Sequence, residues 1–155
     1  MNTYKTARAA AQARDTEQQV DAARLREFPT FAKFSDEDVR RLVHAAHHTS
    51  TSGPWPLILE RTPSDACYIL LSGEAAVYVG RNRVAVVGPG EVIGESALRR
   101  GRLRNATVTT TGKAEVLHIA RDDLDVLLQH IPALRDTMDA TVAKHMPAAV
   151  TETIP

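Results

Sequence analysis

Residues 94–108, GESALRRGRLRNATV, combine residue types that could hold a phosphate and a hydroxyl group. An arginine such as Arg104 presents two parallel N–H donors to a phosphate, which lysine cannot do. Glu95 can accept a hydrogen bond from a hydroxyl group, and Gly94 allows the backbone to come close to a ligand. The stretch is too basic for a core segment and is interrupted by glycine too often for a solvated helix. It therefore predicts a site for an anionic ligand.

A cyclic nucleotide carries both groups, because its cyclic phosphodiester is an anion and its ribose keeps one free hydroxyl. Arg104 would hold the phosphate, and Glu95 would accept from the ribose. A short helix beginning at Ser96 would add backbone N–H donors and a favourable dipole. Arg99, Arg100 and Arg102 are expected to stay in solvent and to raise the local potential. The candidate ligand-binding residues are Gly94, Glu95, Ser96, Ala97, Arg104 and Asn105.

This stretch resembles the phosphate-binding cassette of the cyclic nucleotide-binding domain family. That pattern reads Phe-Gly-Glu-x-Ala-Leu, a short spacer, and then Pro-Arg-x-Ala-Thr-Val. In this chain IGESAL, RRGR and LRNATV stand in those places without a gap. The flanks are also similar to the family, FPTFAKFSDEDVRRL to its leading helices and HIARDDLDVLLQHIPALRDTM to its closing helices, so the resemblance covers residues 25–146. It implies a domain that binds cAMP or cGMP as a regulatory ligand, with no other cofactor.

Three positions depart from the family pattern. Ile93 replaces an aromatic residue, and Leu103 replaces a proline, which is expected to loosen the turn before Arg104. Asn105 stands where the family has mostly alanine, serine or threonine, and threonine there often accompanies a preference for cGMP. The missing threonine favours cAMP binding at least as tight as cGMP binding. Asparagine could donate to a phosphate oxygen, which leaves the choice of base open.

The order of the expected elements is helices, about eight strands, and helices again. Residues 2–27 are polar and rich in alanine, which predicts a lightly packed helix. Ser35 and Asp38 form a capping-box pattern before an amphipathic helix, and three phenylalanines, Phe28, Phe31 and Phe34, are expected to plug one end of the core. Short alternating segments with glycine turns then favour a β-barrel or sandwich.

The resemblance makes this fold class more definite. It implies an α+β, mainly β domain: an eight-stranded β-roll or jelly-roll barrel flanked by N-terminal and C-terminal helices. The expected organisation is a helical extension over residues 1–24, the domain over residues 25–146 and a tail over residues 147–155. The helix beginning at Pro132 is implied to close over the base, where Met138 and Val142 could cover the purine or pack against the barrel.

Several classes of function are disfavoured by the composition. The 19 basic and 19 acidic residues cancel, so no nucleic acid is expected as a partner. No apolar run reaches membrane-spanning length, and the N-terminus lacks a signal-peptide pattern, so a cytoplasmic protein without a membrane partner is expected. Cys67, the single cysteine, is expected to be a buried core residue. His44 and His48 would lie one helical turn apart at a solvent-facing helix end, with no carboxylate or cysteine at ligand spacing, so no metal site is predicted.

The leading hypothesis is a cyclic nucleotide receptor module without catalytic residues, because no hydrolase, metalloprotease or Cys-His motif is present. Only nine residues follow Met146, too few for an attached helix-turn-helix domain. The module is therefore expected to act in trans on an unidentified effector protein, or to be a fragment cut from a larger protein. A homodimer through the terminal helices is a further possibility. The alternative hypothesis is a degenerate, ligand-free domain that serves as a protein-interaction scaffold.

Overall fold

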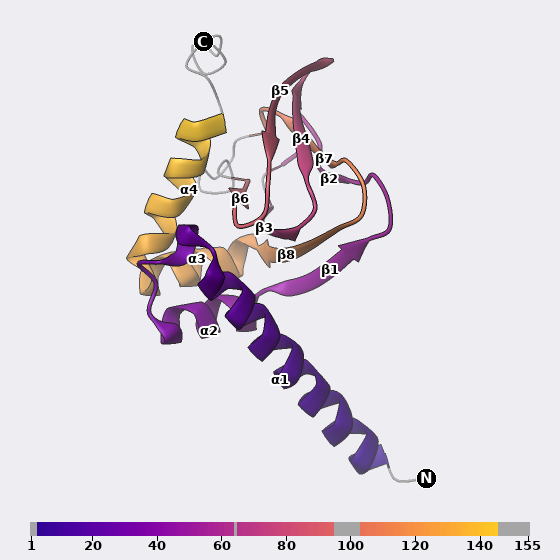
Figure 1. Ribbon diagram of the computed structural model, residues 1–155, viewed down its shortest axis with the longest axis vertical. Helices are drawn as coiled ribbons and strands as arrows, with labels where there is room; N and C mark the ends of the chain where they lie inside the picture. The colour runs from indigo at the N-terminus through magenta and orange to yellow at the C-terminus, as the bar shows by residue number, and fades with distance from the viewer. Residues whose placement is uncertain (1–2, 64, 95–102, 146–155) are drawn as a thin grey trace.

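The computed structural model describes residues 3–63, 65–94 and 103–145. The helices from both ends of the chain gather on one side of the strands (Figure 1). The order of the elements is α1 (Thr3–Glu27), the 3₁₀ helix η1 (Pro29–Phe31), α2 (Asp36–Ala45), β1 (His47–Thr51), β2 (Pro56–Ile58), β3 (Ala66–Ser72), β4 (Ala75–Val79), β5 (Asn82–Val87), β6 (Val92–Ile93), β7 (Thr107–Thr110), β8 (Ala114–Ala120), α3 (Arg121–His130) and α4 (Pro132–His145).

The strands form two antiparallel four-stranded sheets, in the orders β1-β8-β3-β6 and β2-β7-β4-β5. The predicted α+β class is confirmed, and of the barrel and the sandwich that the segment pattern favoured, a closed barrel is not observed. A closed barrel needs one continuous hydrogen-bonded ladder, and the ladders of the described strands stay separate. The edge strand β6 has only two residues, and Pro89 in the connection from β5 has no N–H to donate.

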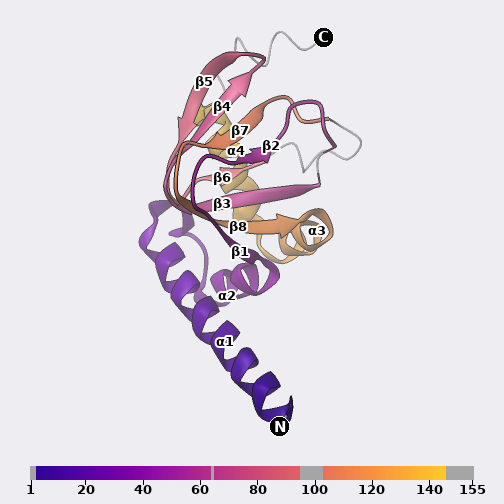
Figure 2. The ribbon, with the colours of Figure 1, turned by 90° about the vertical axis from the view of Figure 1, so that its right-hand side faces the viewer.

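Strands β3 and β8 are buried on both faces of their sheet. Because side chains alternate across a strand, each of these strands contributes residues to two cores. One face joins the helices in a core that includes Cys67, Ile69 and Ile119. The other face meets the second sheet in a core that includes Leu70 and Val116. The molecule therefore has three layers: helices, the β3 sheet and the second sheet (Figures 1 and 2).

The N-terminal helices close the helical side of the core as the sequence predicts. The Ser35 hydroxyl accepts from the Asp38 N–H at 3.0 Å, and the Asp38 carboxylate accepts from the Ser35 N–H at 3.2 Å, which forms the expected capping box. Phe31 and Phe34 are buried, with ring centroids 5.1 Å apart in an edge-to-face arrangement, and Phe28 packs beside them. The interpretation of these three rings as a core plug is confirmed.

Helix α1 is one continuous helix, and its two halves have different surroundings. Near its end Leu25 is fully buried and Asp21 is nearly so. Its N-terminal half extends away from the body of the molecule (Figure 2). None of the described helices is both long and apolar enough to cross a bilayer. The domain boundaries at residues 24 and 146 remain predictions.

The end of α2 differs from the expectation. The helix ends at Ala45, and His47 and His48 belong to strand β1 rather than to a solvent-facing helix end. They pair with His118 and Leu117 of β8. The pairing with β8 supplies backbone hydrogen bonds over all of residues 47–51, and this long-range gain overrides the helical pattern that ends nearby.

Candidate phosphate-binding site

The backbone of Arg104 is fixed on both sides by the segment that precedes β3. The Arg104 N–H donates to the Thr62 carbonyl, and the Arg61 N–H donates to the Arg104 carbonyl, each at 2.8 Å. Leu103 forms an antiparallel bridge with Pro63. The turn before Arg104 is thus held by three neighbouring residues, whereas the missing family proline had led us to expect a looser turn.

The guanidinium of Arg104 is buried at the ends of β3 and β6. The residue is only 4% exposed, and its Nη2 donates to the Ala66 carbonyl. Asp65 lies 3.8 Å from the same nitrogen, but its side chain is 87% exposed, so water screens much of the attraction. Burial lowers the pKa of Arg104 below its ordinary value, and Asp65 acts in the opposite direction. Because arginine keeps its proton in proteins, the site holds a charged donor in a fixed orientation.

Gly94 is the residue that makes room for this arginine. Its φ of +104° is rarely adopted by a residue with a side chain. A Cβ at this position would lie 3.0 Å from both Arg104 Nη1 and the Ala66 carbonyl oxygen, and 3.1 Å from Cys67 Cα. The sequence argument that Gly94 permits a close approach is thus supported, although the group that approaches here is Arg104 itself.

The structure therefore brings two of the six candidate residues, Gly94 and Arg104, into contact. Asn105 follows Arg104 and is exposed. Glu95, Ser96 and Ala97 lie outside the described residues, as do Arg99, Arg100 and Arg102, and their assigned roles remain predictions. The sequence interpretation did not identify the backbone partners Thr62 and Ala66, because a main-chain carbonyl leaves no mark on residue type.

Cys67 lies directly beside this site and has a structural role. It is fully buried, and burial raises the pKa of its thiol to about 12. The thiol therefore stays neutral and poorly nucleophilic at physiological pH. The prediction that Cys67 is a buried strand residue is confirmed.

Helix α4 lies against β5 and β6. Met138 is fully buried in the helix-side core together with Leu134. Met138 was expected either to cover the purine or to pack against the strands, and in this conformation it packs against the strands. The side chain of Val142 lies outside the described part.

The comparisons with known proteins agree with this geometry. Residues 56–130, which include Gly94 and Arg104, match the family model of the cyclic nucleotide-binding domain. This segment belongs to the cyclic nucleotide-binding domain family. The resemblance suggested by the sequence is thereby confirmed.

Three of the proteins that this chain resembles are a kinase and two regulatory proteins of kinases. A cGMP-dependent protein kinase of Toxoplasma gondii is 34% identical over 79 residues, which are 49% of this chain and 8% of the kinase. The regulatory domain of Toxoplasma gondii PKA, co-crystallised with cAMP, has a TM-score of 0.64 and 25% identity and covers 83% of this chain and 51% of its own. The regulatory subunit of a cAMP-independent protein kinase A from Trypanosoma brucei has a TM-score of 0.77 at 17% identity, over 92% of this chain and 53% of its own. The last likeness shows the fold alone.

The contact between Gly94 and Arg104 can be tested by adding one methyl group. Gly94→Ala should lower the free energy of unfolding by about 1–3 kcal/mol, because alanine is strained at this φ and its Cβ would press on the backbone of β3. Urea denaturation measures the change. Gly53→Ala is the matched control, because a Cβ there meets nothing within 4 Å, and its effect should stay within about 0.5 kcal/mol. Equal effects of the two substitutions would contradict the described packing.

Proposed function

We propose that this protein is a receptor module that binds a cyclic nucleotide and regulates an effector protein in trans, without a catalytic activity of its own. The observation that carries the proposal is the buried guanidinium of Arg104 beside Gly94, inside the segment that matches the family. No other cofactor is part of the proposal.

The burial of the Arg104 charge carries a cost in free energy. Taking a guanidinium out of water is expensive unless strong interactions compensate for the lost hydration. The Ala66 carbonyl supplies one such interaction and fixes the plane of the group. A phosphate oxygen would supply a charge-assisted hydrogen bond, which is about twice as strong as a neutral one. Because the group is already oriented, little side-chain entropy would be lost on binding.

The ribose and the base would be recognised by other groups. Glu95 is proposed to accept from the ribose 2′-hydroxyl, and backbone N–H groups at Ser96 and Ala97 to donate to the phosphate. Asn105 is exposed next to Arg104 and has no hydroxyl that could join guanine to the phosphate. We therefore expect cAMP to bind at least as well as cGMP.

A second candidate function is a ligand-free interaction module. It is favoured by the likeness to a regulatory subunit whose kinase is described as cAMP-independent, since that subunit has this fold. The fold by itself is thus compatible with both functions. In the ligand-free alternative, Arg104 would serve only to hold the segment before β3. Titration with cAMP and cGMP separates the two functions.

Regulation requires that the nucleotide bind two conformations with different affinity. Helix α4 is proposed as the moving part, since it lies along β6, the strand that leads into Gly94. Closure of α4 over the base would change which of its side chains are available to an effector. The ligand can shift this equilibrium only by its differential affinity for the two states.

Binding is tested by removing the guanidinium. Arg104→Ala should weaken cAMP binding in calorimetric titration by about 100-fold or more, because a charge-assisted contact worth a few kcal/mol is lost. Arg83→Ala is the matched control, since Arg83 is an exposed arginine of β5, and its affinity should match that of the unchanged protein. Wild-type affinity in Arg104→Ala would refute the proposed role of Arg104. Failure of the unchanged protein to bind either nucleotide would favour the ligand-free module.

The lid is tested by hydrogen exchange. Amides of residues 133–145 should exchange more slowly when saturating cAMP is added, because closure over the base buries part of α4. Amides of α2 serve as the internal control and should not change. Identical exchange of α4 with and without bound cAMP would show that this helix is not the lid, even if the nucleotide binds.

A further inference from the structure

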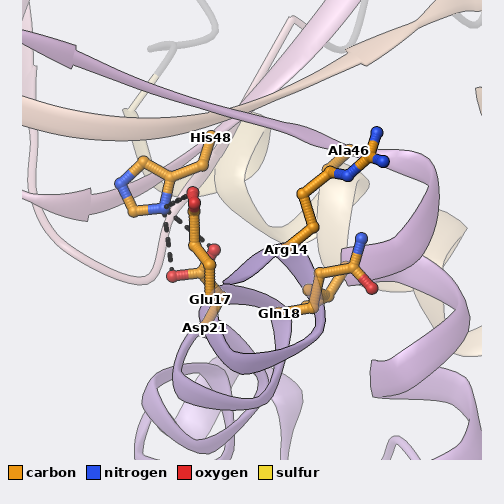
Figure 3. A pocket seen from close by; sticks show the side chains of 7 residues that line it. Arg14, Glu17, Gln18, Asp21, Ala46 and His48 are labelled. Atoms are coloured by element: carbon orange, nitrogen blue, oxygen red, sulfur yellow. Dashed lines mark hydrogen bonds and ion pairs between the residues drawn. The ribbon is translucent and has the colours of Figure 1, made fainter. Parts of the chain in front are cut away.

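Far from Arg104, three side chains that can bind a metal meet between α1 and β1. His48 of β1 turns toward α1, where the carboxylates of Glu17 and Asp21 face it (Figure 3). The Nδ1 atom of His48 lies 2.9 Å from Asp21 Oδ2 and 3.4 Å from Glu17 Oε1. One ligand atom from each residue can be chosen so that all lie within 4.8 Å of one another.

The backbone fixes this arrangement. Glu17 and Asp21 are four residues apart on α1, so they lie on one face of the helix. The Asp21 side chain is 3% exposed and that of His48 is 17% exposed, whereas that of Glu17 is 54% exposed. The three residues line one side of a pocket of about 170 Å³. Asp21 and His48 are thus held in the interior, and Glu17 lies at the entrance of the pocket.

The other nitrogen of His48 decides which lone pair faces the carboxylates. Its Nε2 lies 3.1 Å from Glu115 Oε2, and Arg24 donates to the same oxygen at 2.6 Å. The Ser72 hydroxyl donates to the other oxygen of this carboxylate at 3.4 Å. Glu115 is therefore a carboxylate that can only accept, and Nε2 of His48 must donate to it.

With the proton on Nε2, a neutral His48 points the lone pair of Nδ1 at two carboxylates. That arrangement is repulsive unless a cation lies between the three groups. Either a second proton on His48 or a metal ion can supply the positive charge. Metal-binding histidines commonly donate their other N–H to a carboxylate, as His48 does to Glu115.

We propose that Glu17, Asp21 and His48 form a binding site for a divalent transition-metal ion, with Zn²⁺ as the best match. One imidazole nitrogen and two carboxylate oxygens suit zinc better than Ca²⁺ or Mg²⁺, which prefer oxygen ligands alone. Ligands at about 2.0–2.2 Å from a tetrahedral zinc ion lie about 3.3–3.6 Å apart. The observed separations of 2.9 and 3.4 Å require only small adjustments. Water in the pocket would complete the coordination.

The remaining charged group at the pocket does not block this site. Arg14 also lines the pocket, and its positive charge opposes a second cation. Its guanidinium points away from His48 and the carboxylates (Figure 3). Bound metal would connect α1 directly to β1 and so fix the direction in which the free half of α1 extends. This inference is independent of nucleotide binding.

The test uses the full chain after treatment with EDTA, titrated with zinc chloride in a calorimeter. One zinc ion should bind per chain, and zinc should raise the thermal midpoint of unfolding because it binds only the folded state. Bound Co²⁺ should give the visible spectrum of a low-symmetry site with nitrogen and oxygen ligands. Absence of stoichiometric zinc binding would overturn the proposal, and an imidazolium at His48 would then explain the cluster.

Variants assign the ligands. Glu17→Gln should weaken zinc binding by about tenfold or more without changing the stability of the metal-free protein, since Glu17 is exposed at the pocket entrance. His48→Gln should weaken it further. His130→Gln is the matched control, because His130 is an exposed histidine of α3, and it should bind zinc as the unchanged protein does. Unchanged affinity in both Glu17→Gln and His48→Gln would overturn the assignment.

Discussion

The hydrogen bond from the Arg104 guanidinium to the Ala66 carbonyl is the interaction on which the candidate site depends. It places a permanent positive charge at the start of β3, where the residue is only 4% exposed. Two conditions make this placement possible. Residues 61–63 hold the backbone before and at Arg104, and Gly94 leaves the space that a Cβ would fill. An oriented, partly desolvated cation of this kind is what recognition of a phosphate requires.

Strand β3 links this site to the N-terminal helix. Ala66 at its beginning accepts from Arg104, and at its other end Ser72 donates to Glu115 at 3.4 Å, the carboxylate that also binds Arg24 and His48. The strand is buried on both faces between the helical layer and the second sheet. The proposed nucleotide site and the proposed metal site are therefore attached to opposite ends of one well-packed element. Their positions give the N-terminal helix and the proposed phosphate site a common structural support.

Much of the fold could be predicted from the sequence, because the decisive patterns are local. The capping box of Ser35 and Asp38, the phenylalanine plug, and the spacing from Gly94 to Arg104 are each contained within eleven residues or fewer. The predictions that differ from the structure concern elements whose partners are distant in sequence. The helix was expected to continue through His48, yet pairing with β8 makes this residue part of a strand. The sequence pattern left a barrel and a sandwich open, and only the long-range strand pairing shows two separate sheets.

Contacts between residues distant in sequence also hold the chemistry that the sequence could not show. The carboxylates of Glu17 and Asp21 precede His48 by 31 and 27 residues, and only the packing of α1 brings them to its imidazole. The carbonyls of Thr62 and Ala66 support Arg104 through the main chain. The residues next to His48 in the sequence therefore gave no indication of the proposed metal site. The sequence motif identified Arg104 as a candidate site residue, but it did not identify the carbonyl groups that hold Arg104 in place.

The central claim is that Arg104 directly contacts the phosphate of a cyclic nucleotide, and its guanidinium can be observed in solution. Nitrogen-15 NMR of the arginine side chains, with the Arg104 resonance assigned by its loss in Arg104→Lys, reports hydrogen bonding at this group. Titration with cAMP should shift the Arg104 resonance and slow its exchange with water in proportion to occupancy, while the exposed Arg83 stays unchanged. A protein saturated with cAMP in which the Arg104 resonance does not move would contradict the account.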